Sequence, residues 1–181
     1  MRFPIEIEQR LEIYIGELER WNRKMNLTGL TGPELVRRLV AEPCWIGQQL
    51  QMSGSLLDVG SGNGCPGIPV CVGCKLQAAH LVEARLKRAV FLRHVASRLT
   101  TERIIVHRQR LEDMLAPPKV DWITLQGVKL STTVVETLKR LFAPTTRVVW
   151  ITSGVSMVPA GARVCVPNGN TVAGVLELDQ F

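Results

Sequence analysis

Apolar residues recur at helical spacing along the first part of the chain. Between residues 5 and 21 they return every three or four positions, with acidic side chains early and basic side chains late, which predicts an amphipathic helix. A second helix is expected over residues 33–50, because Thr31 places a capping hydroxyl three residues before Glu34 and a proline stands just inside the start. Residues 1–54 are therefore predicted to form a helical extension.

The pattern changes after this extension, where short apolar runs typical of buried strands alternate with helix-like segments. Such alternation indicates an α/β fold with a largely parallel, seven-stranded sheet and helices on both faces. The last two runs are expected to close one edge of the sheet in antiparallel fashion. The predicted strands cover residues 55–60, 78–84, 103–108, 120–125, 146–152, 162–167 and 173–179, and the predicted helices cover residues 68–75, 85–99 and 132–142.

These elements predict one domain over residues 1–181, in which the extension packs on a Rossmann-like core formed by residues 55–181. A chain of 181 residues with 46% hydrophobic content suits a single folded domain. No apolar run has the length of a membrane span, and the N-terminus lacks the apolar core of a signal peptide. We therefore expect a soluble, cytoplasmic protein that has no contact with membranes.

Five cysteines are present, an odd number that argues against a disulfide framework in a chain without a signal peptide. The stretch CVGC at residues 71–74 has the CxxC spacing of zinc and redox sites. A zinc site needs about four ligands, however, and no second pair follows; the motif also lacks the strand–helix context of a redox pair. We predict that the cysteines are small buried hydrophobic residues and that the chain holds no metal.

The net charge of +6 is concentrated in one segment of the chain. Residues 75–110 contain nine Lys and Arg against Glu83 and Glu102, a local charge of +7, whereas acids and bases balance in residues 1–50 and 111–181. Such a patch is typical of a protein that binds a polyanion. A solvated helix face explains the same charges equally well, so the composition alone leaves both interpretations open.

A glycine-rich stretch, DVGSGNGCPG at residues 58–67, follows the first predicted strand. In open α/β sheets ligands bind beyond the carboxyl ends of the strands, and glycines there let a ligand approach the main chain. GNGCPG matches the dinucleotide fingerprint GxGxxG, which is a weak signal alone. DVGSGNG, an acid followed by glycines at alternate positions, suits S-adenosylmethionine, whose ammonium group Asp58 would bind directly or through water.

Glu83 ends the second predicted strand, 25 residues after Asp58. A carboxylate at this place accepts hydrogen bonds from both hydroxyls of a ribose, which NAD and S-adenosylmethionine share. Pro66 and Pro69 favour S-adenosylmethionine, because they remove backbone N–H groups where a pyrophosphate would bind. An NAD-dependent oxidoreductase is therefore the weaker alternative.

Four segments carry a family resemblance: WNRKMNLTGL, DVGSGNGCPGIP, VEARLKRAVFLRHV and QRLED. Together they resemble the bacterial ribosomal small-subunit methyltransferase G family, also called glucose-inhibited division protein B, specifically over residues 20–125. The resemblance implies a class I methyltransferase fold and S-adenosylmethionine-dependent methylation of 16S ribosomal RNA at N7 of a guanosine. The partner would be small-subunit ribosomal RNA or the 30S subunit, and we expect a monomer.

The resemblance also assigns roles to individual residues. The glycine loop would line the cofactor, Glu83 would bind its ribose, and Leu111 and Glu112 would flank its adenine. The predicted cofactor-binding residues are Asp58, Gly60, Gly62, Gly64, Cys65, Glu83, Leu111, Glu112 and Gln126, and the predicted RNA-binding residues are Arg23, Lys24, Arg85, Lys87 and Arg88. No catalytic residue is named, because guanine N7 has a free lone pair and a sulfonium methyl is already activated, so alignment suffices.

Three positions depart from the family pattern. Gln126 replaces an arginine that follows the fourth strand, Ser153 replaces a lysine before Gly154, and RLVAE at residues 38–42 replaces a His-x-x-Asp-Ser motif. These changes leave the cofactor half of the site intact on sequence grounds and alter the substrate half. The main alternative is therefore a non-catalytic or weakly active RNA-binding and assembly module that retains the fold.

Overall fold

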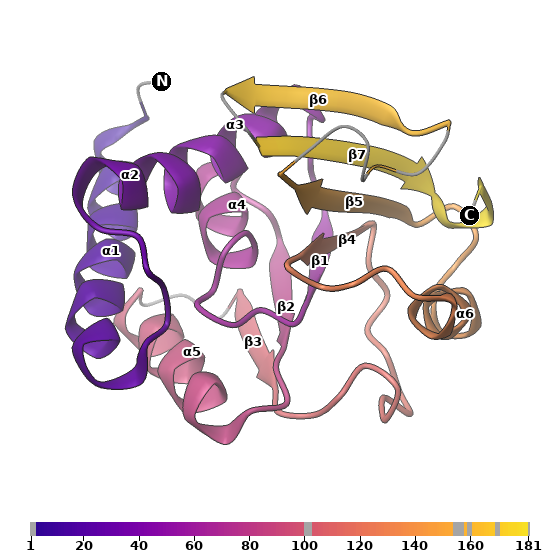
Figure 1. Ribbon diagram of the computed structural model, residues 1–181, viewed down its shortest axis with the longest axis horizontal. Coiled ribbons are helices and arrows are strands. Elements are labelled where there is room, and N and C mark those ends of the chain that lie inside the picture. The colour runs from indigo at the N-terminus through magenta and orange to yellow at the C-terminus, as the bar shows by residue number, and fades with distance from the viewer. Residues whose placement is uncertain (1–2, 100–102, 154–157, 159–160, 169–170, 181) are drawn as a thin grey trace.

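Strands from the whole second part of the chain join in one sheet. The computed structural model describes residues 3–99, 103–153, 158, 161–168 and 171–180, the side chains of 165–168 excepted. The strand order is β3-β2-β1-β4-β5-β7-β6, with β1 to β5 parallel and β7 antiparallel to both of its neighbours (Figure 1). The strands are β1 (Ser55–Val59), β2 (Ala78–Val82), β3 (Ile104–His107), β4 (Trp122–Gln126), β5 (Arg147–Thr152), β6 (Arg163–Asn168) and β7 (Thr171–Glu177).

Helices lie on both faces of this sheet (Figure 1). The N-terminal helices pack with α4 and α5 on one face, and α6 lies on the other. The helices are α1 (Ile5–Met25), α2 (Gly32–Val36), the π-helical turn η1 (Arg37–Ala41), α3 (Glu42–Gln49), α4 (Gly67–Gly73), α5 (Leu86–Arg98), α6 (Thr132–Leu141) and the 3-10 turn η3 (Leu178–Gln180). The predicted α/β architecture, with its antiparallel edge, is confirmed.

The second predicted helix differs from the structure. The sequence predicts an unbroken helix over residues 33–50, whereas η1 interrupts it with a wider turn in which the Glu42 N–H donates to the Arg37 carbonyl, five residues back. Pro43 follows directly and gives the physical reason. Proline has no N–H to donate to the carbonyl four residues earlier, and its ring clashes with that carbonyl, so the helix widens before it.

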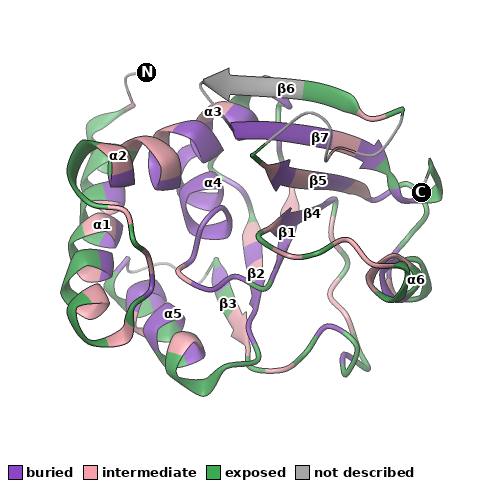
Figure 2. Ribbon diagram, viewed as in Figure 1, coloured by how far each residue is buried: buried purple, intermediate pink, exposed green. Residues whose placement is uncertain are grey.

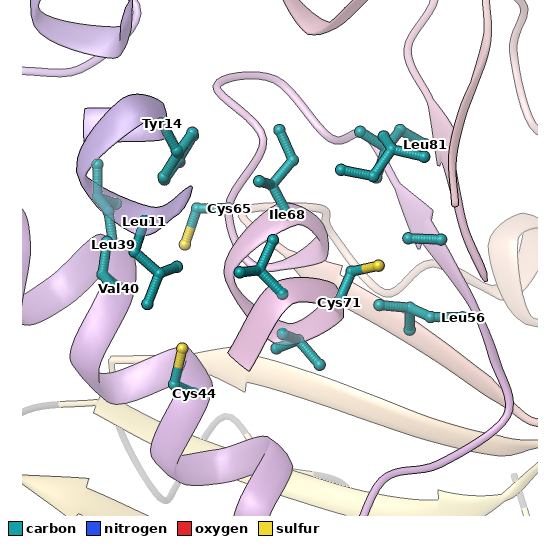
Figure 3. Close-up of a cluster of buried hydrophobic side chains, with 14 of the residues drawn as sticks. Leu11, Tyr14, Leu39, Val40, Cys44, Leu56, Cys65, Ile68, Cys71 and Leu81 are labelled. Atoms are coloured by element: carbon teal, nitrogen blue, oxygen red, sulfur yellow. The ribbon is translucent and has the colours of Figure 1, made fainter. Parts of the chain in front are cut away.

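The larger hydrophobic core surrounds α4, whose residues are all buried (Figures 2 and 3). Leu11 and Tyr14 of α1 meet Cys44, Cys65 and Cys71 here. The three cysteines are buried free thiols, and burial raises the pKa of each of them. The prediction that they are small buried hydrophobic residues is confirmed for these three, whereas Cys74 is a free thiol that is only partly buried. The side chain of Cys165 lies outside the described residues.

A smaller core fills the opposite face of the sheet, under α6 and the segment of residues 108–121. It contains Leu57 and Val59 of β1 and Leu138 of α6, and Leu111 joins it from that segment. Within the described residues, none of the helices combines the length and apolar character that crossing a bilayer requires.

Candidate functional site

The turn between β1 and α4 is built from glycines in the left-handed region. Gly60, Gly62 and Gly64 have φ values of 70°, 52° and 93°, which a residue with a Cβ adopts only with strain. The Gly60 and Ser61 amides both donate to the Val82 carbonyl at the end of β2. The turn, hereafter the glycine loop (residues 60–66), is therefore fixed at the carboxyl edge of β1 and β2, and its main chain carries no side chain at the three glycines.

Glu83 holds this loop from the second strand. Its side chain is buried, with 6% exposure. One carboxylate oxygen accepts from the Gly62 amide over 3.0 Å, and the other accepts from the Arg85 amide over 2.8 Å. Since an ionised carboxylate offers about four acceptor positions, each oxygen keeps one for a further donor. Glu83 is thus a structural part of the loop and still has the capacity to bind hydroxyl groups.

Asp58 lies beneath the loop, fully buried in β1. The Thr124 hydroxyl of the adjacent strand β4 donates to one of its oxygens over 2.7 Å. The other oxygen faces the start of α4, because a Cβ added to Gly67 would lie 2.9 Å from it. Burial raises the pKa of Asp58 to about 7, and the hydrogen bond from Thr124 offsets this only in part. A side chain with no exposed surface makes no direct contact with a ligand above the loop.

The N-terminal extension reaches the loop through Tyr14, which is also fully buried. Its hydroxyl donates to the Asn63 carbonyl over 3.1 Å. A Cβ added to Gly64 would lie 3.3 Å from the Tyr14 ring and 2.6 Å from Ile68. Burial raises the pKa of Tyr14 well above its usual value, so the hydroxyl stays a donor. Helix α1 thus holds the loop at Asn63, while Glu83 holds it at Gly62.

We expect Tyr14→Phe to loosen this attachment of the loop without unfolding the protein. The variant keeps the packed ring and removes one hydrogen bond, so the free energy of unfolding should fall by about 0.5–1.5 kcal/mol. Urea denaturation followed by circular dichroism measures the change, with equal slopes for both proteins as the sign of an unchanged fold. A variant as stable as the wild type would show that the Tyr14–Asn63 hydrogen bond does not hold the loop.

A cavity of about 230 Å³ opens beside the glycine loop at the carboxyl edge of the sheet. Arg88 of α5 lies against the loop, with a guanidinium nitrogen 3.4 Å from the place of a Cβ on Gly62. On the far wall, the Cys65 thiol donates to the Gln126 side-chain oxygen over 3.3 Å. The cavity is lined by Leu27, Leu39, Gly60, Ser61, Gly62, Asn63, Cys65, Arg88, Gln126 and Gly127.

A second, larger cavity of about 630 Å³ adjoins the first. It lies beyond the ends of β4 and β5, and Gln126 and Gly127 line both cavities. Its size falls in the range of small-molecule sites. It is lined by Arg38, Gln126, Gly127, Val128, Lys129, Leu130, Trp150, Ile151, Thr152, Ser153 and Thr171.

The structure brings part of the predicted site together. Gly60, Gly62, Cys65 and Gln126 line the smaller cavity, and Glu83 supports it through the Gly62 amide. Asp58 and Gly64 do not line the cavity and instead face α4, Asp58 at Gly67 and Gly64 at Ile68. Leu111 is buried in the smaller core, and the neighbouring Glu112 is exposed; neither lines one of these two cavities.

The predicted RNA-binding residues lie around the same edge. Arg85 and Lys87 are exposed at the start of α5, while Arg88 is partly buried in the cavity wall. Arg23 and Lys24 are exposed in the last turn of α1. Leu27, which comes shortly after that turn, lines the smaller cavity, so the end of α1 reaches the same rim.

The predicted cofactor-binding set lacks several residues that line or support the smaller cavity. Among them, Leu27 and Leu39 enter the cavity from the extension, and Thr124 binds Asp58. Only Thr124 could have been recognised from the sequence as a candidate site residue, because it is a polar residue within an otherwise apolar strand. In the described part of the chain there is no group of three or more side chains suited to hold a metal ion.

Comparison with known proteins identifies the family of the chain. The model described as rRNA small subunit methyltransferase G matches residues 7–156. The chain belongs to this family. Ribosomal RNA small subunit methyltransferase G of Dichelobacter nodosus is 32% identical over 136 residues, 71% of this chain and 62% of that protein. The protein of that name from Xylella fastidiosa is 40% identical over 100 residues, 55% of this chain and 47% of that protein.

The chain thus spans roughly half to three fifths of the length of these methyltransferase G relatives. Solved structures show the fold. The putative methyltransferase yhhF from Escherichia coli is 15% identical with a TM-score of 0.58, covering 75% of this chain and 84% of that one. A mutant of MtNAS, solved in complex with S-adenosylmethionine, is 14% identical with a TM-score of 0.60. The match covers 94% of this chain and 73% of that one. The class I methyltransferase fold that the sequence predicts is confirmed.

Proposed function

We propose that this family member transfers a methyl group from S-adenosylmethionine to N7 of a guanosine in small-subunit ribosomal RNA. The observation that carries the proposal is the glycine loop with its buried Glu83, which borders a cavity at the carboxyl edge of the sheet. This edge is where parallel α/β sheets bind their ligands. The basic residues around the rim and the membership of the methyltransferase G family support RNA as the substrate.

The residues around the loop fit S-adenosylmethionine better than a dinucleotide. The free acceptor positions of Glu83 suit ribose hydroxyls, and the bare main chain at Gly60 and Gly62 suits a ligand that lies close to it. A pyrophosphate would have to bind at the start of α4. That place is occupied by the Asp58 carboxylate, and α4 is buried throughout. The start of α4 is thus filled by a buried side chain and offers a phosphate no exposed helix end, which disfavours the NAD-dependent alternative.

S-adenosylmethionine, when bound, supplies a methyl group on a positively charged sulfur. The chain then has to bind, orient and exclude water, because guanine N7 carries a free lone pair and needs no base. Glu83 and the loop amides would orient the nucleoside part. Gln126, which accepts a hydrogen bond from the Cys65 thiol, lies in the wall shared with the larger cavity, which would receive the guanine. No proton transfer is required of the protein.

The RNA would meet the rim through its phosphates. Arg85 and Lys87 at the start of α5, and Arg23 and Lys24 at the end of α1, are exposed cations near the cavity. Neutralising phosphates releases counterions, so affinity for RNA should fall as the salt concentration rises. We place the protein in the cytoplasm with the ribosome, as a monomer that acts on small-subunit RNA or the 30S subunit.

Incubation with tritiated S-adenosylmethionine and unmodified small subunits, or their RNA, tests the proposal. Label should enter the RNA and should be blocked by excess S-adenosylhomocysteine, since both compounds would occupy the same loop. A relative of known activity, assayed beside it, is the positive control. Unlabelled RNA across a range of salt concentrations, with an active control, would overturn the proposal.

A second candidate follows from Gln126, which is neutral where the family pattern has an arginine, and from Ser153 beside it in the larger cavity. A member that lost substrate contacts would remain an RNA-binding module without transfer. It predicts salt-dependent RNA binding in a filter or anisotropy assay together with no incorporated label. Retention of RNA that does not respond to salt would count against it.

A further inference from the structure

Two cations line the larger cavity without an ion pair to the described residues: Lys129, which is exposed, and Arg38. Arg38 is partly buried in the cavity wall, and its guanidinium takes part in no ion pair or hydrogen bond that the described residues supply. It comes from η1, a π-helical turn, and such turns often mark functional sites. A guanidinium has five donors and a fixed planar shape, so an unpaired one facing a cavity is a strong candidate for binding an anion.

The neighbouring residue explains why Arg38 is left unpaired. Arg37 forms ion pairs with both Glu34 and the buried Glu42. The other oxygen of Glu42 accepts from the Thr171 hydroxyl. The carboxylates near η1 are therefore already satisfied, and the wider turn directs two consecutive arginines to different surroundings. Arg37 neutralises acids of the extension, and Arg38 brings positive charge to the cavity.

Arg38 also lies near the wall that the two cavities share. Burial raises the pKa of the Cys65 thiol well above its usual value, and the nearby Arg38 charge acts in the opposite direction. The same thiol donates to Gln126. Arg38 and Gln126 thus line the same cavity although they are far apart in sequence, and Gln126 also lines the smaller cavity together with Cys65.

From this arrangement we infer that Arg38 binds the phosphate of the target nucleotide and holds its base in the larger cavity. This rests on the proposed function and deepens it by naming the substrate contact on the side away from the glycine loop. The N-terminal extension then supplies the positive charge that the neutral wall at Gln126 lacks. An arginine fork matches phosphate oxygens in bidentate fashion, which fixes orientation as well as affinity.

Arg38→Gln tests the inference, with Arg38→Lys to separate charge from shape. For small-subunit RNA, kcat/KM should fall at least about tenfold in Arg38→Gln and less in Arg38→Lys. The slope of log affinity against log salt should become shallower by roughly 0.7–0.9 in Arg38→Gln, since one phosphate contact is lost, and stay unchanged in Arg38→Lys. Affinity for S-adenosylhomocysteine should not change, because Arg38 does not line the smaller cavity.

Arg10→Gln is the matched control. Arg10 is also a partly buried arginine without an ion pair or hydrogen bond among the described residues, but it lines a cavity with Lys75 and Arg103, next to the amino ends of β2 and β3. It should behave like the wild type in every assay. An Arg38→Gln variant with the wild-type salt slope or wild-type kcat/KM would overturn the inference. If the wild type binds RNA but transfers no methyl group, the proposed function fails while the salt slopes still test Arg38.

Discussion

Alanine in place of Glu83 should weaken the binding of S-adenosylhomocysteine by about 1.5–3 kcal/mol, the scale of hydrogen bonds to a charged group. That corresponds to roughly a 10- to 150-fold rise in Kd. The variant should also lose about 1–3 kcal/mol of stability, because the buried Gly62 amide, which donates to Glu83, is left without its acceptor. Calorimetric titration and urea denaturation measure the two effects separately.

Asp113→Ala is the control for this variant, since Asp113 is an exposed acid near the same edge whose carboxylate forms no hydrogen bond with the described residues. Asp113→Ala should change neither the binding free energy of S-adenosylhomocysteine nor the free energy of unfolding by more than about 0.5 kcal/mol. If Glu83→Ala lost stability and kept its affinity, Glu83 would only brace the loop. If it kept both, the arrangement of Glu83 with Gly62 and Arg85 would have no role in the site.

Asp58→Asn should remove a pH dependence of stability that the wild type shows between about pH 4 and pH 7. Burial raises the pKa of Asp58 to about 7, so the folded protein holds this proton more tightly than the unfolded chain, whose carboxyl has its ordinary value near 3.9. The wild type should therefore lose stability as the pH rises through this window, by up to about 4 kcal/mol. Above about pH 7 the loss should level off.

Urea denaturation of both proteins at closely spaced pH values measures this difference. Subtracting the Asp58→Asn curve removes the titration of every other group, provided that the asparagine accepts the Thr124 hydrogen bond as the aspartate does. Parallel curves for the two proteins would mean that Asp58 is ionised in the folded state at low pH, contrary to its burial beside Gly67.

The sheet could be predicted from the sequence because each strand carries its own apolar run. The predicted segments 55–60 and 146–152 differ from β1 and β5 by a single residue each. The interrupted helix could not be predicted from hydrophobic spacing, since the apolar face continues through Pro43 while the backbone hydrogen bonds do not. A proline inside a periodic segment breaks the regular hydrogen bonds of the helix, and the spacing of apolar side chains does not reveal this break.

The candidate site was predictable where its residues come directly after a strand in the sequence. Gly60, Gly62 and Glu83 follow strands directly, so the rule for carboxyl edges places them together. The burial of Glu83 was not predicted, because its partners are backbone amides that carry no sequence signal. The approach of Arg38 to Gln126 was not predicted either, because it depends on how the extension packs across the sheet.

The proposed function is tested most directly by identifying the nucleoside that the protein modifies. Small-subunit RNA treated with the protein and labelled S-adenosylmethionine is digested to nucleosides, which are separated and identified by mass spectrometry. We expect label in 7-methylguanosine, absent when S-adenosylhomocysteine is in excess and strongly reduced with Glu83→Ala. RNA without label, or label confined to another nucleoside or another position of guanosine, would contradict the proposed function.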